Sequence, residues 1–179
     1  IDAFHLPARR HSQMTLFDQD QALPASVPVP LARALDAQGY TSLTPVQLAM
    51  LDEGRAAADL LVSAQTGSGK TVAFGLAIAT TLLAGEDHLP PPDRPLGLVV
   101  APTRELAMQV HRELAWLYAN ADARFATCVG GMDMRTERRA LERGAHVVVG
   151  TPGRLRDHIM KGSLDLGALR AVVLDEADE

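Results

Sequence analysis

The stretch Ala64-Gln65-Thr66-Gly67-Ser68-Gly69-Lys70-Thr71 decides the fold of this 179-residue chain. It follows a short apolar run, Leu60-Leu61-Val62, and precedes an apolar run of helical character from Val72 to Ala84. A strand, a glycine-bearing turn, a lysine, a hydroxyl residue and a helix in this order predict a phosphate-binding loop, with Ala64 where its first glycine usually stands. The alternative is a glycine- and serine-rich surface turn with an exposed lysine.

The residue types in this stretch suit a polyphosphate. Gly67 and Gly69 allow the backbone to curl so that successive N–H groups point inward, where the positive end of the following helix also acts. We expect Lys70 to reach the β- and γ-phosphates and Thr71 to offer its hydroxyl to Mg²⁺. The predicted nucleotide-binding residues of the loop are Ala64, Gln65, Thr66, Gly67, Ser68, Gly69, Lys70 and Thr71.

Composition narrows the class of protein. Hydrophobic residues make up 47% of the chain, which is typical of a globular domain, and the net charge of −5 argues against a broadly cationic nucleic-acid binder. The single cysteine, Cys128, excludes an internal disulfide and suits a cytoplasmic protein. No apolar run is long enough to span a bilayer, so we expect no membrane partner.

The chain divides into an arm and one domain. Residues 1–28 read as an irregular arm, of which Ile1–Gln13 resemble a vector-derived tag before a native start at Met14. Residues 29–179 read as the domain. It opens with a short helix at Pro30–Gln38 and a second helix that begins at Pro45 with Thr44 as its N-cap.

From Leu60 onward, strands and helices alternate. We expect strands at 60–64, 97–101, 124–129, 146–150 and 171–175, and helices at 70–84, 104–119, 133–143 and 153–161. Runs such as Val147-Val148-Val149 lack polar alternation, which is typical of strands covered on both faces. The sequence therefore predicts an α/β fold with a mostly parallel sheet and helices on both faces, joined by a polar, proline-rich surface loop at 85–96.

A second pattern closes the last strand. Val172-Val173-Leu174 is followed by Asp175, Glu176, Ala177 and Asp178. Ligands in open α/β sheets lie at the carboxyl ends of strands, so we expect Asp175 to hold Mg²⁺ and Glu176 to orient the attacking water. Lys70, Asp175 and Glu176 are thus the predicted catalytic residues, and Thr71 and Asp175 the metal ligands. The alternative is a solvated acidic loop after a strand.

Asp175-Glu176-Ala177-Asp178 resembles the signature of the DEAD-box RNA helicases of helicase superfamily two. Gly39-Tyr40 and Thr44-Pro45-Val46-Gln47 resemble the Q motif of that family, which implies that Gln47 reads the adenine edge and Tyr40 stacks on the ring. Without the other motifs, Gln47 would be interpreted as a surface residue at the start of a helix. The aromatic residue that the family usually carries upstream is replaced by Ala22, with Phe17 out of register, and Leu43 replaces a proline.

Three further segments resemble family motifs that follow strands. Each combines a helix start or a glycine pair with a nearby arginine, and the resemblance implies that they grip the sugar–phosphate backbone of single-stranded or duplex RNA without reading its sequence. Taken singly, each would read as a plain helix cap. The implied RNA-binding residues are Pro102, Thr103, Arg104, Gly130, Gly131, Thr151, Pro152, Gly153 and Arg154.

The resemblance implies a RecA-like phosphate-binding-loop domain that uses ATP and Mg²⁺ and works with a second RecA-like domain, to which Asp178 couples. It also implies that residues 1–179 alone hydrolyse ATP negligibly, because the arginine fingers come from that second domain. In this fold a further strand lies between those at 60–64 and 171–175, so we expect these two not to pair directly.

The leading interpretation is the N-terminal half of an ATP-dependent RNA helicase that separates RNA duplexes locally. Two alternatives remain: a nucleotide-gated RNA clamp or assembly platform, and a related DNA translocase. The carboxylate pair disfavours a pure platform, and the Q motif with Asp178 favours RNA by resemblance.

Overall fold

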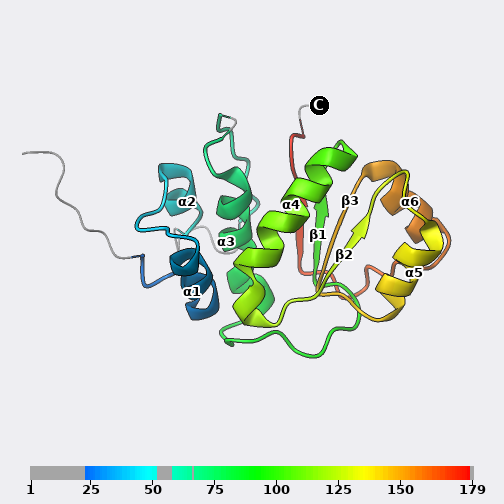
Figure 1. The fold of residues 1–179 in the computed structure, drawn as a ribbon, viewed down its shortest axis with the longest axis horizontal. Coiled ribbons are helices and arrows are strands. Elements are labelled where there is room, and N and C mark those ends of the chain that lie inside the picture. The colour runs from blue at the N-terminus through cyan, green and yellow to red at the C-terminus, as the bar shows by residue number, and fades with distance from the viewer. Residues whose placement is uncertain (1–22, 52–57, 66, 178–179) are drawn as a thin grey trace, which may run out of the picture.

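Four short parallel strands form the centre of the molecule. The computed structural model describes residues 23–51, 58–65 and 67–177, and within them the strands are β1 (Gly97–Val100), β2 (Phe125–Cys128), β3 (Val147–Gly150) and β4 (Ala171–Leu174). They lie in the order β2-β3-β1-β4. Because all the pairings are parallel, the carboxyl ends of the four strands lie together at the same end of the sheet (Figure 1).

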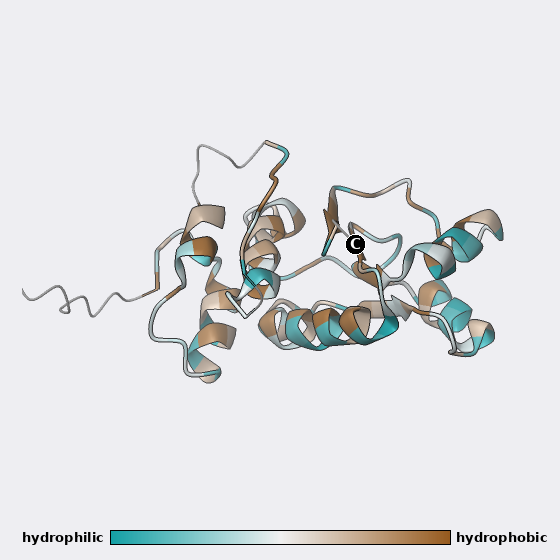
Figure 2. Ribbon diagram, turned by 90° about the horizontal axis from the view of Figure 1, so that it is seen from above, coloured by the Kyte–Doolittle hydropathy of each residue, from teal (hydrophilic) through white to brown (hydrophobic). Residues whose placement is uncertain are grey.

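Helices cover both faces of this sheet. α3 (Lys70–Leu83) and α4 (Arg104–Leu117) lie on one face, and α5 (Met134–Glu142) and α6 (Pro152–Met160) belong to the other. α2 (Pro45–Met50) packs against α3, and α1 (Val29–Ala37) packs against α4 and the short 3-10 turn that follows it, η2 (Ala119–Ala121). Figure 2 shows hydrophobic and hydrophilic residues alternating along α4, as expected of a helix with one face on the core.

The alternation of side chains along the strands divides the core into two clusters. Val99 of β1 packs in the larger cluster with α3 and α4, whereas its neighbour Leu98 packs in the smaller one with Leu155 of α6. The larger cluster also holds Tyr118, whose fully buried hydroxyl donates a 2.6 Å hydrogen bond to the Gly75 carbonyl of α3. Burial of each such apolar side chain contributes about 1.5–3 kcal/mol to folding.

Most of the expected elements are confirmed. The sheet is parallel with helices on both faces, and the helices and the other four strands lie where they were expected, with ends that differ by one or two residues at most. β4 is an exception to the expected burial on both faces, because Val172 and Leu174 are 55% and 65% exposed. Thr44 caps α2 as predicted, because its hydroxyl accepts a hydrogen bond from the Gln47 amide. Cys128 is buried, and burial raises the pKa of its thiol to about 12, so it is a core residue.

The predicted strand at 60–64 is wrong. These residues pair with no strand of the described chain, and Leu61 is 98% exposed. A strand exists only where a neighbour satisfies its backbone groups, and among the described residues β4 pairs with β1 alone. As expected, 60–64 and the β4 segment do not pair with each other.

The proline-rich loop at 85–96 is anchored to the sheet through His146, which precedes β3. The Arg124 amide donates to His146 Nδ1 at 2.9 Å, so this nitrogen is an acceptor and Nε2 carries the hydrogen. Nε2 then donates to the Pro90 carbonyl at 2.6 Å. Burial lowers the pKa of this imidazole, which keeps the ring neutral in the fold.

Candidate functional site

The glycine-bearing turn lies directly before α3. Gly67 and Gly69 adopt φ angles of +81° and +83°, which only glycine takes without strain, and Gly69 is the N-cap of the helix. The Ser68 hydroxyl is buried without a hydrogen-bond partner among the described residues. Lys70 and Thr71 are the first two residues of α3. The turn therefore places a buried hydroxyl, without a partner among the described residues, at the positive end of a helix.

The start of α2 braces this turn from the side. Thr44 and Gln47 form a capping box, in which Gln47 Oε1 accepts from the Thr44 amide at 2.9 Å. The Thr44 hydroxyl donates to the Ser68 carbonyl at 3.1 Å, and Gln47 Nε2 donates to the Gly69 carbonyl at 3.4 Å. A Cβ atom at Gly69 would lie 2.5 Å from Gln47 Nε2. The segment that resembles the Q motif is thus built against the phosphate-binding turn.

Tyr40 lies away from these polar contacts. Its ring is tilted against Trp116 of α4, with ring centroids 6.0 Å apart, and it packs on the larger core cluster. Gln47 is only 1% exposed, so its amide faces the turn rather than solvent. Gln47 therefore hydrogen bonds to the turn, whereas the Tyr40 ring contacts Trp116.

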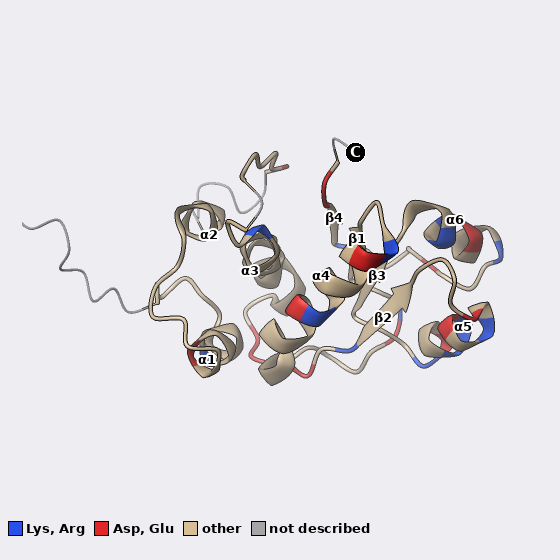
Figure 3. Cartoon of the chain, turned by 45° about the horizontal axis from the view of Figure 1, so that its top comes forward, with Lys and Arg blue, Asp and Glu red and all other residues tan. Residues whose placement is uncertain are grey.

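The carboxylates after β4 meet the lysine of the turn. Lys70 Nζ lies 2.9 Å from Glu176 Oε1, and both side chains are about three-quarters buried. Figure 3 shows the basic start of α3 and the acidic segment after β4 at the same end of the sheet. Residues far apart in the sequence are therefore joined at one place, at the carboxyl end of β4.

Asp175 occupies an environment that disfavours its charge. Burial raises the pKa of its carboxyl, the neighbouring Glu176 raises it further, and Lys70 only partly offsets both. Its Oδ1 accepts a hydrogen bond from the Glu176 amide at 3.1 Å, and its own amide continues the ladder to the Val100 carbonyl. A carboxylate of this kind gains from a nearby cation.

The segments after β1, β2 and β3 form a second group at the same edge of the sheet. Thr103 caps α4 by accepting from the Leu106 amide at 3.2 Å. Arg104 Nη1 donates to the Gly130 carbonyl at 3.3 Å, and a Cβ atom at Gly131 would lie 2.7 Å from the same nitrogen. Gly131 has a φ of +78°. The glycine pair therefore lets the Arg104 side chain cross the loop closely.

The segment after β3 turns its arginine inward. Thr151 is the N-cap of α6, and its amide donates to the Cys128 carbonyl at 3.0 Å. Pro152 and Gly153 are exposed, whereas the Arg154 side chain is 14% exposed and donates through Nη2 to the Met132 carbonyl at 3.0 Å. Arg154 thus contacts the loop that contains Gly130 and Gly131.

Some predicted residues lie outside the described residues, namely Thr66, Asp178, Phe17 and Ala22. The sequence interpretation also missed Glu137 of α5, which is buried beneath the glycine-pair loop. The arginines that follow Glu137 in the sequence suggest a solvent-exposed helix, but helical spacing puts Glu137 on the same face of α5 as the apolar residues Met134 and Leu141. An acid on an apolar stripe was the available signal.

In the part of the chain that the structure describes, none of the helices combines the length and the apolar character needed to cross a membrane.

The family model and the related proteins that match this chain are all described as helicases. A family model described as DEAD/DEAH box helicase matches residues 44–179. The chain is 38% identical to DEAD-box ATP-dependent RNA helicase 35B of Oryza sativa subsp. japonica, over 96% of this chain and 30% of the relative. It is 40% identical to DEAD-box ATP-dependent RNA helicase CshA of Bacillus licheniformis, over 93% of this chain and 32% of the relative. The chain thus spans about a third of the length of these relatives.

A solved structure supports the same conclusion. The crystal structure of a hypothetical ATP-dependent RNA helicase from Sulfolobus tokodaii matches with a TM-score of 0.71 and 34% sequence identity, over 83% of this chain and 41% of that one. The likeness confirms the expected RecA-like α/β fold. Family model, relatives and fold agree that this chain belongs to the DEAD/DEAH box helicase family.

Proposed function

We propose that this chain is the ATP- and RNA-binding N-terminal RecA-like unit of an ATP-dependent RNA helicase. The observation that carries the proposal is the 2.9 Å contact between Lys70 of the glycine-bearing turn and Glu176 after β4. A lysine at a helix N-terminus and a carboxylate pair at one strand end are parts that phosphoryl transfer requires. The buried thiol of the single cysteine, Cys128, fits a reducing compartment, and we place the protein in the cytoplasm.

The triphosphate lies along the turn from Ala64 to Thr71, where backbone N–H groups and the Ser68 hydroxyl donate to it. Lys70 exchanges its contact with Glu176 for the β- and γ-phosphates, which releases the Glu176 carboxylate to orient the attacking water.

The residues present fit a magnesium ion. Mg²⁺ in nucleotide sites takes one or two carboxylates, with phosphate oxygens and water completing its shell. Asp175 supplies the carboxylate and Thr71, in the first turn of α3, the hydroxyl. When bound between these residues, such an ion would neutralise charge on the phosphates. Asp175 gains as well, because a cation offsets the burial that raises its carboxyl pKa.

Adenine recognition falls to Gln47, with Tyr40 on the ring face. A glutamine amide has two acceptor sites and two N–H groups, and this structure uses one of each, on the Thr44 amide and the Gly69 carbonyl. The remaining pair matches the adjacent donor and acceptor of adenine. Because Gln47 is 1% exposed, adenine contact requires a local side-chain movement.

RNA binds along the segments after β1, β2 and β3. The first turns of α4 and α6 present N–H groups to phosphates, and the Gly130-Gly131 pair permits close approach of the backbone. The residues proposed for this contact are Pro102, Thr103, Arg104, Gly130, Gly131, Thr151, Pro152, Gly153 and Arg154. A second RecA-like domain closes on both ligands, with Asp178 as the coupling residue, and closure separates a duplex locally.

Steady-state ATP hydrolysis by the full-length protein tests this function. We expect stimulation by single-stranded RNA, no equal stimulation by DNA of the same sequence, and separation of a short RNA duplex that needs ATP. Lys70→Ala should abolish turnover. Equal stimulation by DNA would identify a DNA translocase, and RNA-stimulated turnover without duplex separation would identify a clamp or platform. Residues 1–179 alone should show no RNA-stimulated turnover.

A further inference from the structure

Glu137 is a buried carboxylate without a role in the nucleotide site. Its side chain is 1% exposed, and it lies in the first turns of α5, directly after the loop that carries Gly130 and Gly131. Acidic side chains are almost never buried to this degree unless they are paired. Its partners therefore show what the burial achieves.

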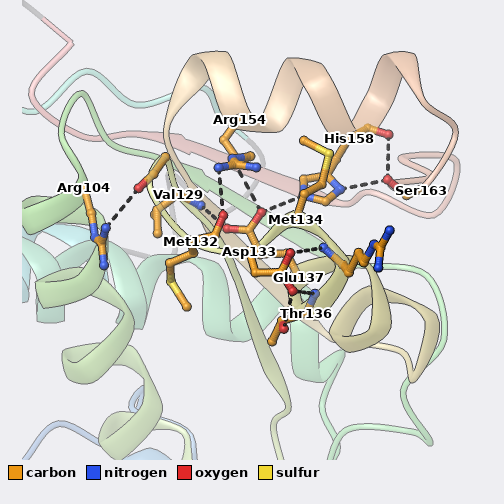
Figure 4. A network of polar contacts seen from close by, with 12 residues as sticks. Arg104, Val129, Met132, Asp133, Met134, Thr136, Glu137, Arg154, His158 and Ser163 are labelled. Carbon is orange, nitrogen blue, oxygen red and sulfur yellow. Dashed lines mark hydrogen bonds and ion pairs between the residues drawn. The ribbon is translucent and has the colours of Figure 1, made fainter.

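Each carboxylate oxygen of Glu137 holds a different part of the site. Oε1 accepts a hydrogen bond from the Val129 amide at 2.9 Å. Oε2 lies 2.8 Å from His158 Nε2 and 3.6 Å from Arg154 Nε, both on α6 (Figure 4). One side chain thus joins the end of β2, the glycine-pair loop and α6.

The loop is consequently fixed on both sides of its glycines. Val129, directly before Gly130, is bound by Glu137 itself. Met132, directly after Gly131, is bound through its carbonyl by Arg154, the same arginine that faces the Glu137 carboxylate. Removal of Glu137 would release the first attachment and leave the guanidinium of the second without its counter-charge.

Neighbouring contacts hold Glu137 and its partners in place. Asp133 caps α5 by accepting from the Arg135 and Thr136 amides, which fixes where the helix begins. On the other side, His158 Nδ1 lies 2.8 Å from the Ser163 hydroxyl, which orients the imidazole ring toward Glu137. The carboxylate also lies near the positive end of α5.

We propose that Glu137 is a positioning residue for RNA binding, which sets the Gly130-Gly131 loop and Arg154 in the arrangement that receives a backbone phosphate. This inference rests on the proposed function, because it gives the buried network the task of shaping the RNA site. Glu137 acts through Val129, Arg154 and His158 and makes no contact with RNA itself. The alternative is a buried network that only stabilises the fold.

His146 provides the matched control. It is as buried as Glu137, at 2% exposure, and it also joins two segments by hydrogen bonds. Because it precedes β3, it lies at the amino ends of the strands, whereas the RNA segments follow their carboxyl ends. A loss of general stability would affect RNA binding equally in both variants. A loss of positioning would affect only the Glu137 variants.

The experiment compares full-length wild type, E137A, E137Q and H146A. Fluorescence anisotropy measures affinity for a labelled single-stranded RNA in the presence of a non-hydrolysable ATP analogue and Mg²⁺. Binding of a fluorescent ATP analogue measures nucleotide affinity, and thermal unfolding measures stability. We expect E137A to lose about tenfold in RNA affinity, with nucleotide affinity unchanged. E137Q retains an acceptor for the Val129 amide but loses the ion pair with Arg154, so its loss should be smaller. H146A should lose stability and keep RNA affinity.

The outcomes separate the two proposals. RNA affinity at the wild-type level in both folded Glu137 variants overturns the positioning role, as does an equal loss in H146A at matched stability. Should E137A not fold, E137Q decides by the same criterion. Wild type that binds ATP but no RNA overturns the proposed function itself. A double variant E137A/R154A should lose less than the sum of its single variants, because both residues hold the same loop.

Discussion

At the scale of the residue, the contact between Lys70 and Glu176 brings the two sequence motifs together at one site. Both motifs could be recognised from sequence, because each combines an apolar run with residue types that few other roles explain. The 2.9 Å contact between Lys70 Nζ and Glu176 Oε1 joins the two motifs in the fold. The glycines of the turn owe their identity to backbone geometry and to the close approach of Gln47.

Gly69→Ala should impair the turn more than Gly67→Ala. Both positions have φ near +80°, so alanine at either costs about 1–2 kcal/mol of unfolding free energy. Only at position 69 would the new methyl group also meet Gln47 Nε2, at 2.5 Å. Urea denaturation and binding of a fluorescent ATP analogue measure the two effects. Equal losses in the two variants would show that the contact with Gln47 is unimportant.

The buried imidazole of His146 makes stability depend on pH. Burial lowers the pKa of His146, and burial likewise lowers that of His111, from about 6.5 in the unfolded chain. A lowered histidine pKa contributes stability that is present above the unfolded pKa and is lost as pH falls through the folded one. Urea denaturation between about pH 5 and 8 should therefore show unfolding free energy rising with pH in the lower part of this range.

His146→Gln tests the source of this dependence. A glutamine can accept from the Arg124 amide and donate to the Pro90 carbonyl without titrating. The increase of unfolding free energy with pH should become less steep in this variant, and the dependence that remains should be due to His111. An unchanged slope would assign the whole effect to other groups.

At the scale of the element, periodicity and capping predicted most of the fold. Val147–Val149 was predicted as a buried strand because no polar residue interrupts it, and the predicted cap at Thr44 is confirmed by the structure. The failure at 60–64 has a different cause. Leu60-Leu61-Val62 has the composition of a strand, but strand formation depends on a neighbouring strand, which composition cannot supply.

The outer side of β4 should promote association of residues 1–179. Among the described residues β4 pairs only on its β1 side, which leaves its other edge unpaired. On one face of the sheet at this edge, Val172 and Leu174 are also 55% and 65% exposed. Exposed apolar strand edges are templates for pairing with other chains. Sedimentation velocity should show concentration-dependent association, which Val172→Lys reduces. A monodisperse wild-type chain across the same concentrations would contradict this expectation.

At the scale of the whole molecule, the parallel sheet explains why the site could be predicted at all. Parallel strands bring their carboxyl ends to one edge, so residues after β1, β2, β3 and β4 gather there although they are distant in sequence. Glu137 could not be predicted in the same way. Its partners, Val129 and His158, come from elements whose packing only the three-dimensional fold determines.

The central claim is that a magnesium-bound triphosphate lies between the turn Gly67–Thr71 and the carboxylate of Asp175. The most direct test is the magnesium dependence of binding of a fluorescent ATP analogue to wild type, Asp175→Asn and Lys70→Ala. We predict that Mg²⁺ strengthens binding to wild type, that Asp175→Asn removes this dependence, and that Lys70→Ala weakens binding with or without Mg²⁺. A magnesium dependence that is unchanged in Asp175→Asn would contradict the account.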